Sequence, residues 1–284
     1  MKNQSASNTG QSRSAWLRKT LTVSQFVIAQ FFVIATIVVG RQLDHSINMD
    51  MGFTKDNIVS VRVPFDFYKP DQKFIVFRDE LQRVSGIERV SLGDRPAISG
   101  SMSSTYKFTR DGKERELNVQ MRNGDTGFIN LFKIKLLAGR NLRASDTGTA
   151  FLINESFAKE MGYNNPGDAV GKYIGDEKKI EVAGVMKDFN LTSARFGILP
   201  MALRTNTNFY HEMQVALAPG VGSQGADKGS QKKTIATIEQ VFKKIYPDKE
   251  FSYTYYDQTI KDFYGKEQQL AKLLNWSTGL SVFI

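Results

Sequence analysis

The sequence predicts an α+β protein whose folded part lies outside a membrane, after one transmembrane helix and before the start of another. Three observations predict this arrangement. An uncharged segment lies near the N-terminus, a second apolar run lies at the C-terminus, and strand and helix patterns alternate between them. The 284 residues are enough for about two domains of ordinary size.

The composition is that of a globular chain and excludes several classes of protein. With 41% hydrophobic and 24% charged residues, the chain resembles neither a disordered tail nor a collagen-like repeat. It contains no cysteine, so disulfides, thiolate metal sites, iron–sulfur clusters and cysteine nucleophiles are excluded. Its two histidines, His45 and His211, are too few for a histidine-rich metal site.

The first element is a transmembrane helix at Thr20–Gly40, which carries no charge. Its apolar stretch Leu21–Val39 would span about 28 Å as a helix, close to the ~30 Å of a hydrocarbon core. A signal peptide is the first alternative, but its apolar region is shorter and ends at a small-residue cleavage site, unlike Val38–Gln42. A buried helix of a soluble core is the second, and such helices are rarely uncharged over this length. We therefore expect a retained helix.

Nearly half of the net charge of +9 lies beside this helix. Residues 1–40 contain Lys2, Arg13, Arg18 and Lys19 and no acidic residue. Basic residues flank the cytoplasmic side of a membrane helix, so we expect a cytoplasmic segment at residues 1–19 and an extracytoplasmic region at 41–269. This placement argues against a nucleic-acid partner.

A second apolar run begins near the C-terminus. Leu273–Ile284 follows Lys272 without a charge but covers only about 18 Å as a helix. We expect residues 270–284 to be the start of a second transmembrane helix, and the chain to be a piece of a longer membrane protein.

A β-α-β pattern occupies about residues 55–94. Ile58–Val63 is an alternating, β-branched strand, and Ile87–Leu92 is the next one. The helix between them is expected to begin at Pro70-Asp71 and to end at Gly86. Its apolar face consists of Phe74, Phe77, Leu81 and Val84.

A second β-α-β pattern occupies about residues 206–256. Ser230 can cap its helix, Tyr246-Pro247 ends that helix, and Phe251–Tyr255 is the last strand. The first strand alternates at Met213, Val215 and Leu217, and the helix face is Ile235, Ile238, Phe242 and Ile245. Two such halves predict a ferredoxin-like split βαβ layer.

The region between the halves, about residues 95–205, is predicted to be a strand-rich second subdomain. Asp111-Gly112 is a hairpin signal, and Asn154 can cap a helix that ends at Gly162. The remaining elements are expected at Tyr106–Arg110, Lys113–Met121, Asp125–Phe132, Lys133–Gly139, Ala150–Ile153, Glu155–Met161 and Lys179–Lys187.

Two glycine patterns fail as nucleotide sites. Gly220-x-Gly222-x-x-Gly225 matches a dinucleotide fingerprint, but Ala226–Gly229 separates it from the helix that should hold the pyrophosphate. We interpret it as a polar loop. Gly167–Lys172 lacks the first glycine and the final serine or threonine of a phosphate-binding loop.

No constellation of catalytic or metal-binding residues emerges. His45 and His211 have no carboxylate pattern of a triad or a metal site near them, and paired acids and lysines are expected on solvated faces. These pairs are Asp79-Glu80, Glu114 with Glu116, Lys232-Lys233 and Lys243-Lys244. We expect no catalytic, cofactor-binding or metal site, and no enzyme.

The two membrane segments suggest a mechanical role. Asp257 can cap a helix that continues from Gln258 through Leu270 into the second apolar run, and the first helix continues toward Leu43. Two stiff helices can carry a rigid-body displacement, which flexible linkers cannot. The alternative is a simple tether.

Several stretches resemble the MacB-like periplasmic core domain of FtsX-type ABC transporter permeases, especially those built from two such repeats. Together with the flanking apolar segments, they cover the chain from about Trp16 onward. The stretches are Leu17–Phe26, Asp50–Phe53, Phe128–Asn141, Ile153–Gly162, Asn165–Lys172, Val182–Asn190 and Tyr255–Leu270.

This resemblance implies a non-catalytic permease subunit in the cell inner membrane, with a periplasmic, porter-like layer interrupted by a second subdomain. It implies a separate cytoplasmic ABC ATPase, a second permease copy or repeat, the lipid bilayer and a periplasmic protein as partners. It also implies that ATP-driven motion serves export or efflux of lipoproteins, peptides or drugs. The family offers no catalytic residues to transfer and no cofactor.

Two other classes stay open from the residues alone. An extracytoplasmic domain between two membrane helices is also typical of a sensor domain in a two-span membrane receptor. A membrane-anchored enzyme would need a polar catalytic cluster, which the sequence does not display. Sequence beyond Ile284 would separate the permease from the sensor.

Overall fold

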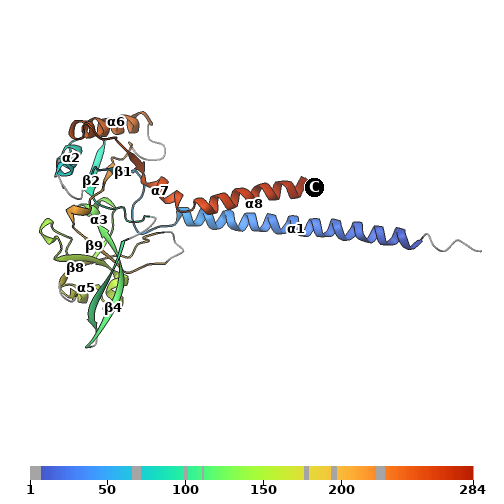
Figure 1. Cartoon of the computed structure of the whole chain (residues 1–284), viewed down its shortest axis with the longest axis horizontal. Helices are drawn as coiled ribbons and strands as arrows, with labels where there is room; N and C mark the ends of the chain where they lie inside the picture. The colour runs from blue at the N-terminus through green and yellow to red at the C-terminus, as the bar shows by residue number, and fades with distance from the viewer. Residues whose placement is uncertain are drawn as a thin grey trace, which may run out of the picture. The chain divides into compact units, whose positions relative to one another are not determined.

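The computed structural model describes residues 8–65, 72–98, 102–110, 112–175, 179–192, 197–221 and 228–283. The chain divides into two compact units (Figure 1). The first unit is Met1–Met49 with Tyr264–Ile284, and the second is Asp50–Phe263.

The first unit is a pair of helices. Helix α1, Asn8–Asn48, and helix α8, Gly265–Phe283, pack against each other (Figure 1). The Oγ1 atoms of Thr36 and Thr278 lie 2.9 Å apart in a hydrogen bond between them. Among the described residues, α1 is the one helix that is long and apolar enough to cross a membrane, with a mean hydropathy of 2.1 over its best window.

The prediction of one continuous C-terminal helix is wrong. Helix α7, Tyr256–Asp262, ends before α8 begins, and the residues between them form a turn. Asp257 does not cap α7 but lies in its first turn, where its carboxylate pairs with Lys261 at 3.0 Å. The physical reason is that α7 has buried residues of its own, Tyr256 and Ile260, which belong to the core of the second unit.

The first and last strands of the second unit form a four-stranded sheet. Its order is β11-β1-β10-β2, and all neighbours are antiparallel. Strands β1 and β2 are joined through a helix but separated in the sheet by β10, so the predicted split βαβ layer is confirmed. The elements of this layer are β1 Ile58–Arg62, α2 Lys73–Leu81, β2 Ile87–Leu92, β10 Glu212–Leu217, α6 Lys228–Ile245 and β11 Tyr253–Tyr255.

Helices α2 and α6 contribute the apolar core on one face of this sheet. Phe77 of α2 and Phe242 of α6 meet edge to face at 5.6 Å. Helix α2 ends at Leu81 rather than at Gly86, and its expected start at Pro70-Asp71 lies outside the described residues. Helix α6 begins before Ser230, whose carbonyl accepts a bond from Thr234 Oγ1 at 3.1 Å instead of marking the helix start.

The middle of the chain forms a seven-stranded sheet of order β3-β4-β9-β6-β8-β5, with β7 paired to β8. Its strands are β3 Met102–Arg110, β4 Lys113–Asn123, β5 Leu136–Gly139, β6 Ala150–Asn154, β7 Tyr173–Ile174, β8 Ile180–Met186 and β9 Met201–Arg204. The accompanying helices are α3 Phe128–Leu131, η1 Ala144–Asp146, α4 Glu155–Glu160, α5 Pro166–Ala169 and η3 Thr207–Phe209.

The predicted hairpin and cap are present in this strand-rich part. Gly112 takes a φ of 71° in the β3–β4 turn, and the hairpin extends away from the rest of the sheet (Figure 1). The Asn154 side chain accepts a bond from Phe157 N at 3.1 Å and caps α4. The sequence patterns missed α5, β7 and β9, because each has only two to four residues and so no measurable period.

Candidate functional site: a polar junction between the two sheets

The second face of the four-stranded sheet is buried against the strand-rich part and is mixed in character. Its apolar residues Ile58 and Ala216 belong to a core cluster shared with that part, and polar residues lie between them and segment 93–97. Ser60, Ser91 and Gln214 are all buried there. The Ser60 hydroxyl donates to Gln214 Oε1 at 2.6 Å, and Ser91 Oγ donates to Asp125 Oδ1 at 2.7 Å. Because Asp125 follows β4, this last bond joins the two sheets.

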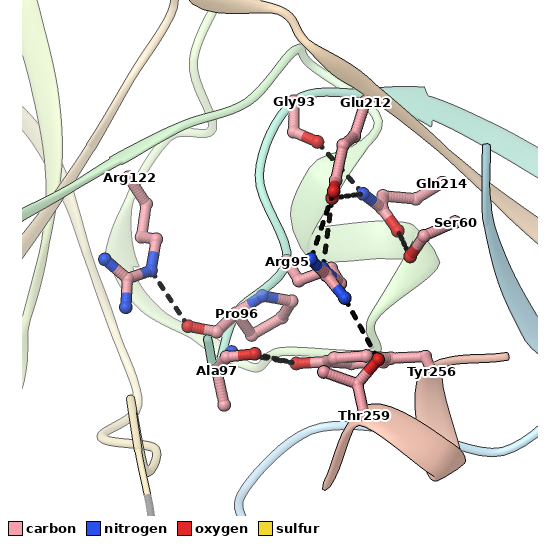
Figure 2. Close-up of polar contacts among 10 residues, drawn as sticks. All are labelled: Ser60, Gly93, Arg95, Pro96, Ala97, Arg122, Glu212, Gln214, Tyr256 and Thr259. Carbon is pink, nitrogen blue, oxygen red and sulfur yellow. Dashed lines mark hydrogen bonds and ion pairs between the residues drawn. The ribbon is translucent and has the colours of Figure 1, made fainter. Parts of the chain in front are cut away.

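We refer to the ten residues drawn in Figure 2 as the junction, because their polar contacts connect the two sheets. It consists of Ser60, Gly93, Arg95, Pro96, Ala97, Arg122, Glu212, Gln214, Tyr256 and Thr259. Its centre is the segment 93–97, by which the chain leaves β2 for the strand-rich part.

Gly93 lies at a close approach of the two sheets. Its nitrogen donates to Glu212 O at 3.0 Å, and its carbonyl accepts from Gln214 Nε2 at 3.0 Å. It also forms an isolated β-bridge with Gly124. With a φ of 128°, it leaves no room for a side chain, because a Cβ would collide with the backbone of Asn123 and Gly124.

Arg95 joins the same segment to helix α7. Its Nε and Nη2 atoms each lie 3.0 Å from an oxygen of Glu212, in a two-pronged ion pair. Its Nη1 donates to Thr259 Oγ1 at 3.0 Å (Figure 2). The planar guanidinium therefore holds the start of β10 and the middle of α7 in one geometry.

Tyr256 is fully buried at the start of α7 and contacts three parts of the unit. Its hydroxyl donates to Ala97 O at 3.1 Å and accepts from Ala97 N at 2.8 Å. Its ring stacks on Phe53 at 5.8 Å and meets Phe132 at 5.8 Å. Burial raises the pKa of Tyr256 far above its ordinary value, so the hydroxyl remains a protonated donor.

Arg122, at the end of β4, is a fully buried guanidinium held by carbonyl groups. It donates to Pro96 O and to Met121 O, both at 2.9 Å, and to Leu191 O at 3.5 Å. Desolvation lowers its pKa, and the nearby Asp94 and Tyr256 act in the opposite direction. The cation thus ties segment 93–97 to the strand-rich part.

Asp94 is the acidic member of this region. Its Oδ2 accepts from the backbone and side-chain nitrogens of Asn123 at 2.7 and 3.0 Å. Burial raises the pKa of Asp94, although these two bonds and the charges of Arg122 and His211 act to lower it.

An aromatic cluster anchors the first residues of this unit beside the junction. We define it as Phe53, Phe128, Phe132, Phe189 and Tyr256, whose rings contact one another. The segment Asp50–Phe53 is fixed there, since Asn190 N donates to Met51 O at 2.9 Å. Gly52, with a φ of 86°, fits because a Cβ would lie 2.8 Å from Phe189 Cβ.

The structure brings together several of the stretches that carry the family resemblance, although they are far apart along the chain. Asp50–Phe53, Phe128–Asn141, Val182–Asn190 and Tyr255–Leu270 each contribute a ring to the aromatic cluster. Asp188 also accepts bonds from Asn154 Nδ2 at 2.8 Å and Ser156 N at 2.9 Å, which adds the stretch Ile153–Gly162.

Sequence reasoning missed the polar members of the junction. Arg95, Arg122, Glu212 and Gln214 have no characteristic spacing. The one available signal was Gln214, a polar residue inside an apolar strand, which alternation alone places on a solvated face.

The residues weighed for catalysis are scattered. His45 is exposed on α1, whereas His211 is exposed with its ring 4.3 Å from that of Phe65. Glu114 pairs with Lys107 at 2.9 Å on the hairpin, and Asp79 pairs with Arg78 at 2.8 Å. Across the described ranges, no group of three or more histidine, aspartate or glutamate residues could hold a metal ion.

The glycine pattern at Gly167–Lys172 lies apart from the junction. The lysine pairs Lys232-Lys233 and Lys243-Lys244 are exposed on helix α6, as expected from the sequence, and they are not part of the junction either. Gly167–Lys172 overlaps the short helix α5, Pro166–Ala169. Most of the Gly220–Gly225 pattern lies outside the described residues.

Comparison with known proteins gives one family and several solved structures. The family model of the MacB-like periplasmic core domain matches residues 20–229. No curated protein matches the chain. The periplasmic region of MacB from Actinobacillus actinomycetemcomitans is 16% identical with a TM-score of 0.49, over 76% of this chain and 96% of that one.

Two further solved structures are similar. The extracellular domain of the noncanonic ABC-type transporter YknZ from Gram-positive bacteria is 17% identical, with a TM-score of 0.44, over 70% of this chain and 98% of that one. A domain of a putative permease protein from Porphyromonas gingivalis is 20% identical, with a TM-score of 0.47, over 72% of this chain and 93% of that one.

Proposed function

The chain belongs to the MacB-like periplasmic core domain family, and we propose that it is a permease subunit whose outer domain relays ATP-driven motion to substrate handling outside the inner membrane. The family is that of ABC transporter permeases, which act with an ABC ATPase. The transport we propose is export or efflux of a lipoprotein, peptide or drug, and the role of this chain is non-catalytic.

The observation that carries this proposal is the position of Tyr256. This single side chain contacts Phe53, which lies near the first residues of the outer unit, and Ala97, which lies between the two sheets. It also belongs to α7, the last helix of that unit. A displacement of the first or the last residues of this unit would therefore reach the junction through Tyr256 alone.

The polar contacts on the second face of the four-stranded sheet support a moving role. Hydrogen bonds and ion pairs are directional, so an interface made of them can exchange one defined set of partners for another. An interdigitated apolar core has no such alternative set, because its side chains are close-packed. The bonds of Arg95, Gln214 and Tyr256 are the contacts that we propose are exchanged.

The membrane segment supports the orientation that we propose. Arg13, Arg18 and Lys19 precede the apolar part of α1, and such residues favour the cytoplasmic side. The outer unit then faces the periplasm, and the partner ATPase lies in the cytoplasm with residues 1–19. A second permease copy or repeat and a periplasmic protein are the further partners that we propose.

The first test is association with an ATPase. The full-length protein, solubilised in mild detergent at low salt, should co-purify with a cytoplasmic ABC ATPase. A receptor with a sensor domain would instead co-purify with no ATPase, and that result would contradict the proposal.

The second test distinguishes a relay from a tether. Tyr256→Phe keeps the ring but removes both bonds to Ala97, so it should change the ATP hydrolysis rate of the reconstituted complex. Changes along a coupling network typically alter coupling by about 0.5–2 kcal/mol. The matched control is Tyr163→Phe, a partly buried tyrosine of the strand-rich part. Equal rates in both variants and the wild type would indicate a tether.

A further inference from the structure

The outer edge of strand β3 is open. In the seven-stranded sheet, β3 is the terminal strand and pairs in register with β4 alone. The carbonyl of Lys107 accepts a bond from Gly175 N at 2.8 Å, so the backbone groups of Lys107 point away from β4. The N–H and C=O groups of a strand residue lie on the same side and alternate along the strand. Those of Ser103 and Thr105 therefore point outward as well.

The short strand β7 covers only part of this edge. Tyr173–Ile174 and Gly175 lie beside Lys107. Ser103 and Thr105 are exposed, and their outward backbone groups have no partner among the residues that the structure describes. An uncovered edge of this kind is a template for another strand.

The stretch Met102–Thr105 also lacks the features by which edges are usually protected. It contains no proline, no lysine and no break in its register with β4. Met102 exposes 47% of its surface, which adds an apolar contact for a neighbouring strand. The edge is therefore chemically suited to pairing.

A cleft of about 730 Å³ adjoins this edge. Its walls include Thr105 and Tyr106 of β3, buried Phe151 and Ile180, and the polar residues Arg204 and Asn206. This volume lies in the range of about 300–1,000 Å³ that is typical of ligand sites. The walls are mixed, because the polar residues Lys107, Glu116 and Thr205 also line the cleft. Such walls can contact both apolar and polar side chains of an added peptide.

The charge of the site favours an acidic occupant. The charged residues of the cleft wall are Lys107, Glu116 and Arg204. Lys107 already pairs with Glu114 at 2.9 Å, so the preference for an acidic occupant depends on Arg204. Arg204 donates to Asn123 Oδ1 at 2.9 Å and lies 5.2 Å from the ring centre of Phe209. It has no carboxylate partner within the described part of the chain.

We propose that the outer edge of β3 and the adjoining cleft bind an extended, acidic polypeptide segment of another protein. The segment adds as a strand beside Ser103 and Thr105 and places a carboxylate against Arg204. Main-chain bonds provide the affinity, and the cleft with its arginine provides the selectivity. This site goes beyond the proposed relay and does not depend on it.

The test uses the full chain in detergent and two labelled hexapeptide probes. Both alternate threonine and valine, and one ends in glutamates whereas the other ends in lysines. Fluorescence anisotropy should show the acidic peptide binding at least about tenfold more tightly. Hydrogen exchange should slow at the amides of Ser103 and Thr105 when that peptide is bound.

Two pairs of variants distinguish a loss of strand pairing with the peptide from a general loss of folding. Thr105→Pro removes an outward N–H but no bond to β4, so it should lower the affinity for the acidic peptide at least about tenfold. The control Thr105→Ala should bind this peptide with the affinity of the wild type. Arg204→Gln keeps a donor for Asn123 but loses the charge, and it should abolish the preference for the acidic peptide. Arg204→Lys should retain part of that preference.

Three results would overturn the proposal. They are no binding of the acidic peptide to the wild type, equal affinities for the two peptides, and unchanged binding in Thr105→Pro. If Thr105→Pro does not fold, the exchange protection and the Arg204 pair decide the question. None of these results bears on association with an ATPase, so the failure of this site and the failure of the relay are distinguishable.

Discussion

The two faces of the four-stranded sheet are made by alternate residues of the same strands, yet they differ in chemistry. On one face, Val59, Val61 and Val215 pack beneath α2 and α6 in an apolar core. On the other face, Ser60 and Gln214 are equally buried but hydrogen-bonded to each other and to segment 93–97.

The difference shows how one face of a sheet can hold its own layer together while the other face determines how a second sheet docks on it. The stabilisation from apolar burial is non-directional and depends mainly on the area that is buried. Buried polar groups are stable only when each has a partner, so they favour defined arrangements of the two sheets in which all of them are paired and penalise imperfect ones. The apolar face holds the layer together, and the polar face determines how the strand-rich part docks on it.

The largest effect is expected on the apolar face. Phe242 is fully buried, and its ring lies between 5.1 and 5.6 Å from the rings of Phe77, Tyr246 and Phe251. Phe242→Ala should lower the free energy of unfolding by about 3–5 kcal/mol. Urea unfolding of the outer domain, followed by tyrosine circular dichroism, measures this. The control Lys244→Ala, on the exposed side of the same helix, should change it by less than about 0.5 kcal/mol.

A smaller but partner-dependent effect is expected on the polar face. Gln214→Leu leaves the Gly93 carbonyl and the Ser60 hydroxyl buried without their partner, which should cost about 1–3 kcal/mol. Adding Ser60→Ala removes one of these unpaired groups, so the double variant should be more stable than the sum of the single effects predicts. Strict additivity in the same unfolding assay would show that the face behaves like the apolar one.

The smallest effect is a dependence on pH at Asp94. Burial raises the pKa of Asp94 in the folded state above its ordinary value of 3.8, so the folded protein holds this proton more strongly than the unfolded chain. Stability from this group is therefore present at low pH and is lost as the pH rises from that ordinary value upward. Relative to Asp94→Asn, the wild type should lose stability over this window in urea unfolding. A relative gain would contradict the assigned direction.

Much of the split βαβ layer could be predicted because its elements have long, regular patterns. Phe74, Phe77 and Leu81 form the buried face of α2 as their spacing indicates. Alternation correctly identified the apolar residues of β10, such as Val215, but could not show that Gln214 is buried too, because period two only separates the faces.

The junction could be predicted only in part. The stretches that contain Phe53, Phe132 and Tyr256 were singled out by resemblance, but their convergence in one cluster depends on long-range packing. The break between α7 and α8 was missed for the same reason, since a helical pattern continues across it. Arg95 has no local signal, because its partners Glu212 and Thr259 lie far away in the sequence.

The most direct test of the relay is a distance between the two sheets during ATP turnover. Because the chain has no cysteine, Gln240→Cys on α6 and Lys159→Cys on α4 can carry spin labels at exposed positions. Labels at Lys159→Cys and Lys172→Cys, both in the strand-rich part, form the control pair.

Electron–electron double resonance on the full-length complex with its ATPase gives the two distance distributions. We predict that the α6–α4 distance changes between the nucleotide-free and the ATP-trapped complex, while the control distance stays the same. A single, unchanged α6–α4 distance in an actively hydrolysing complex would contradict this prediction.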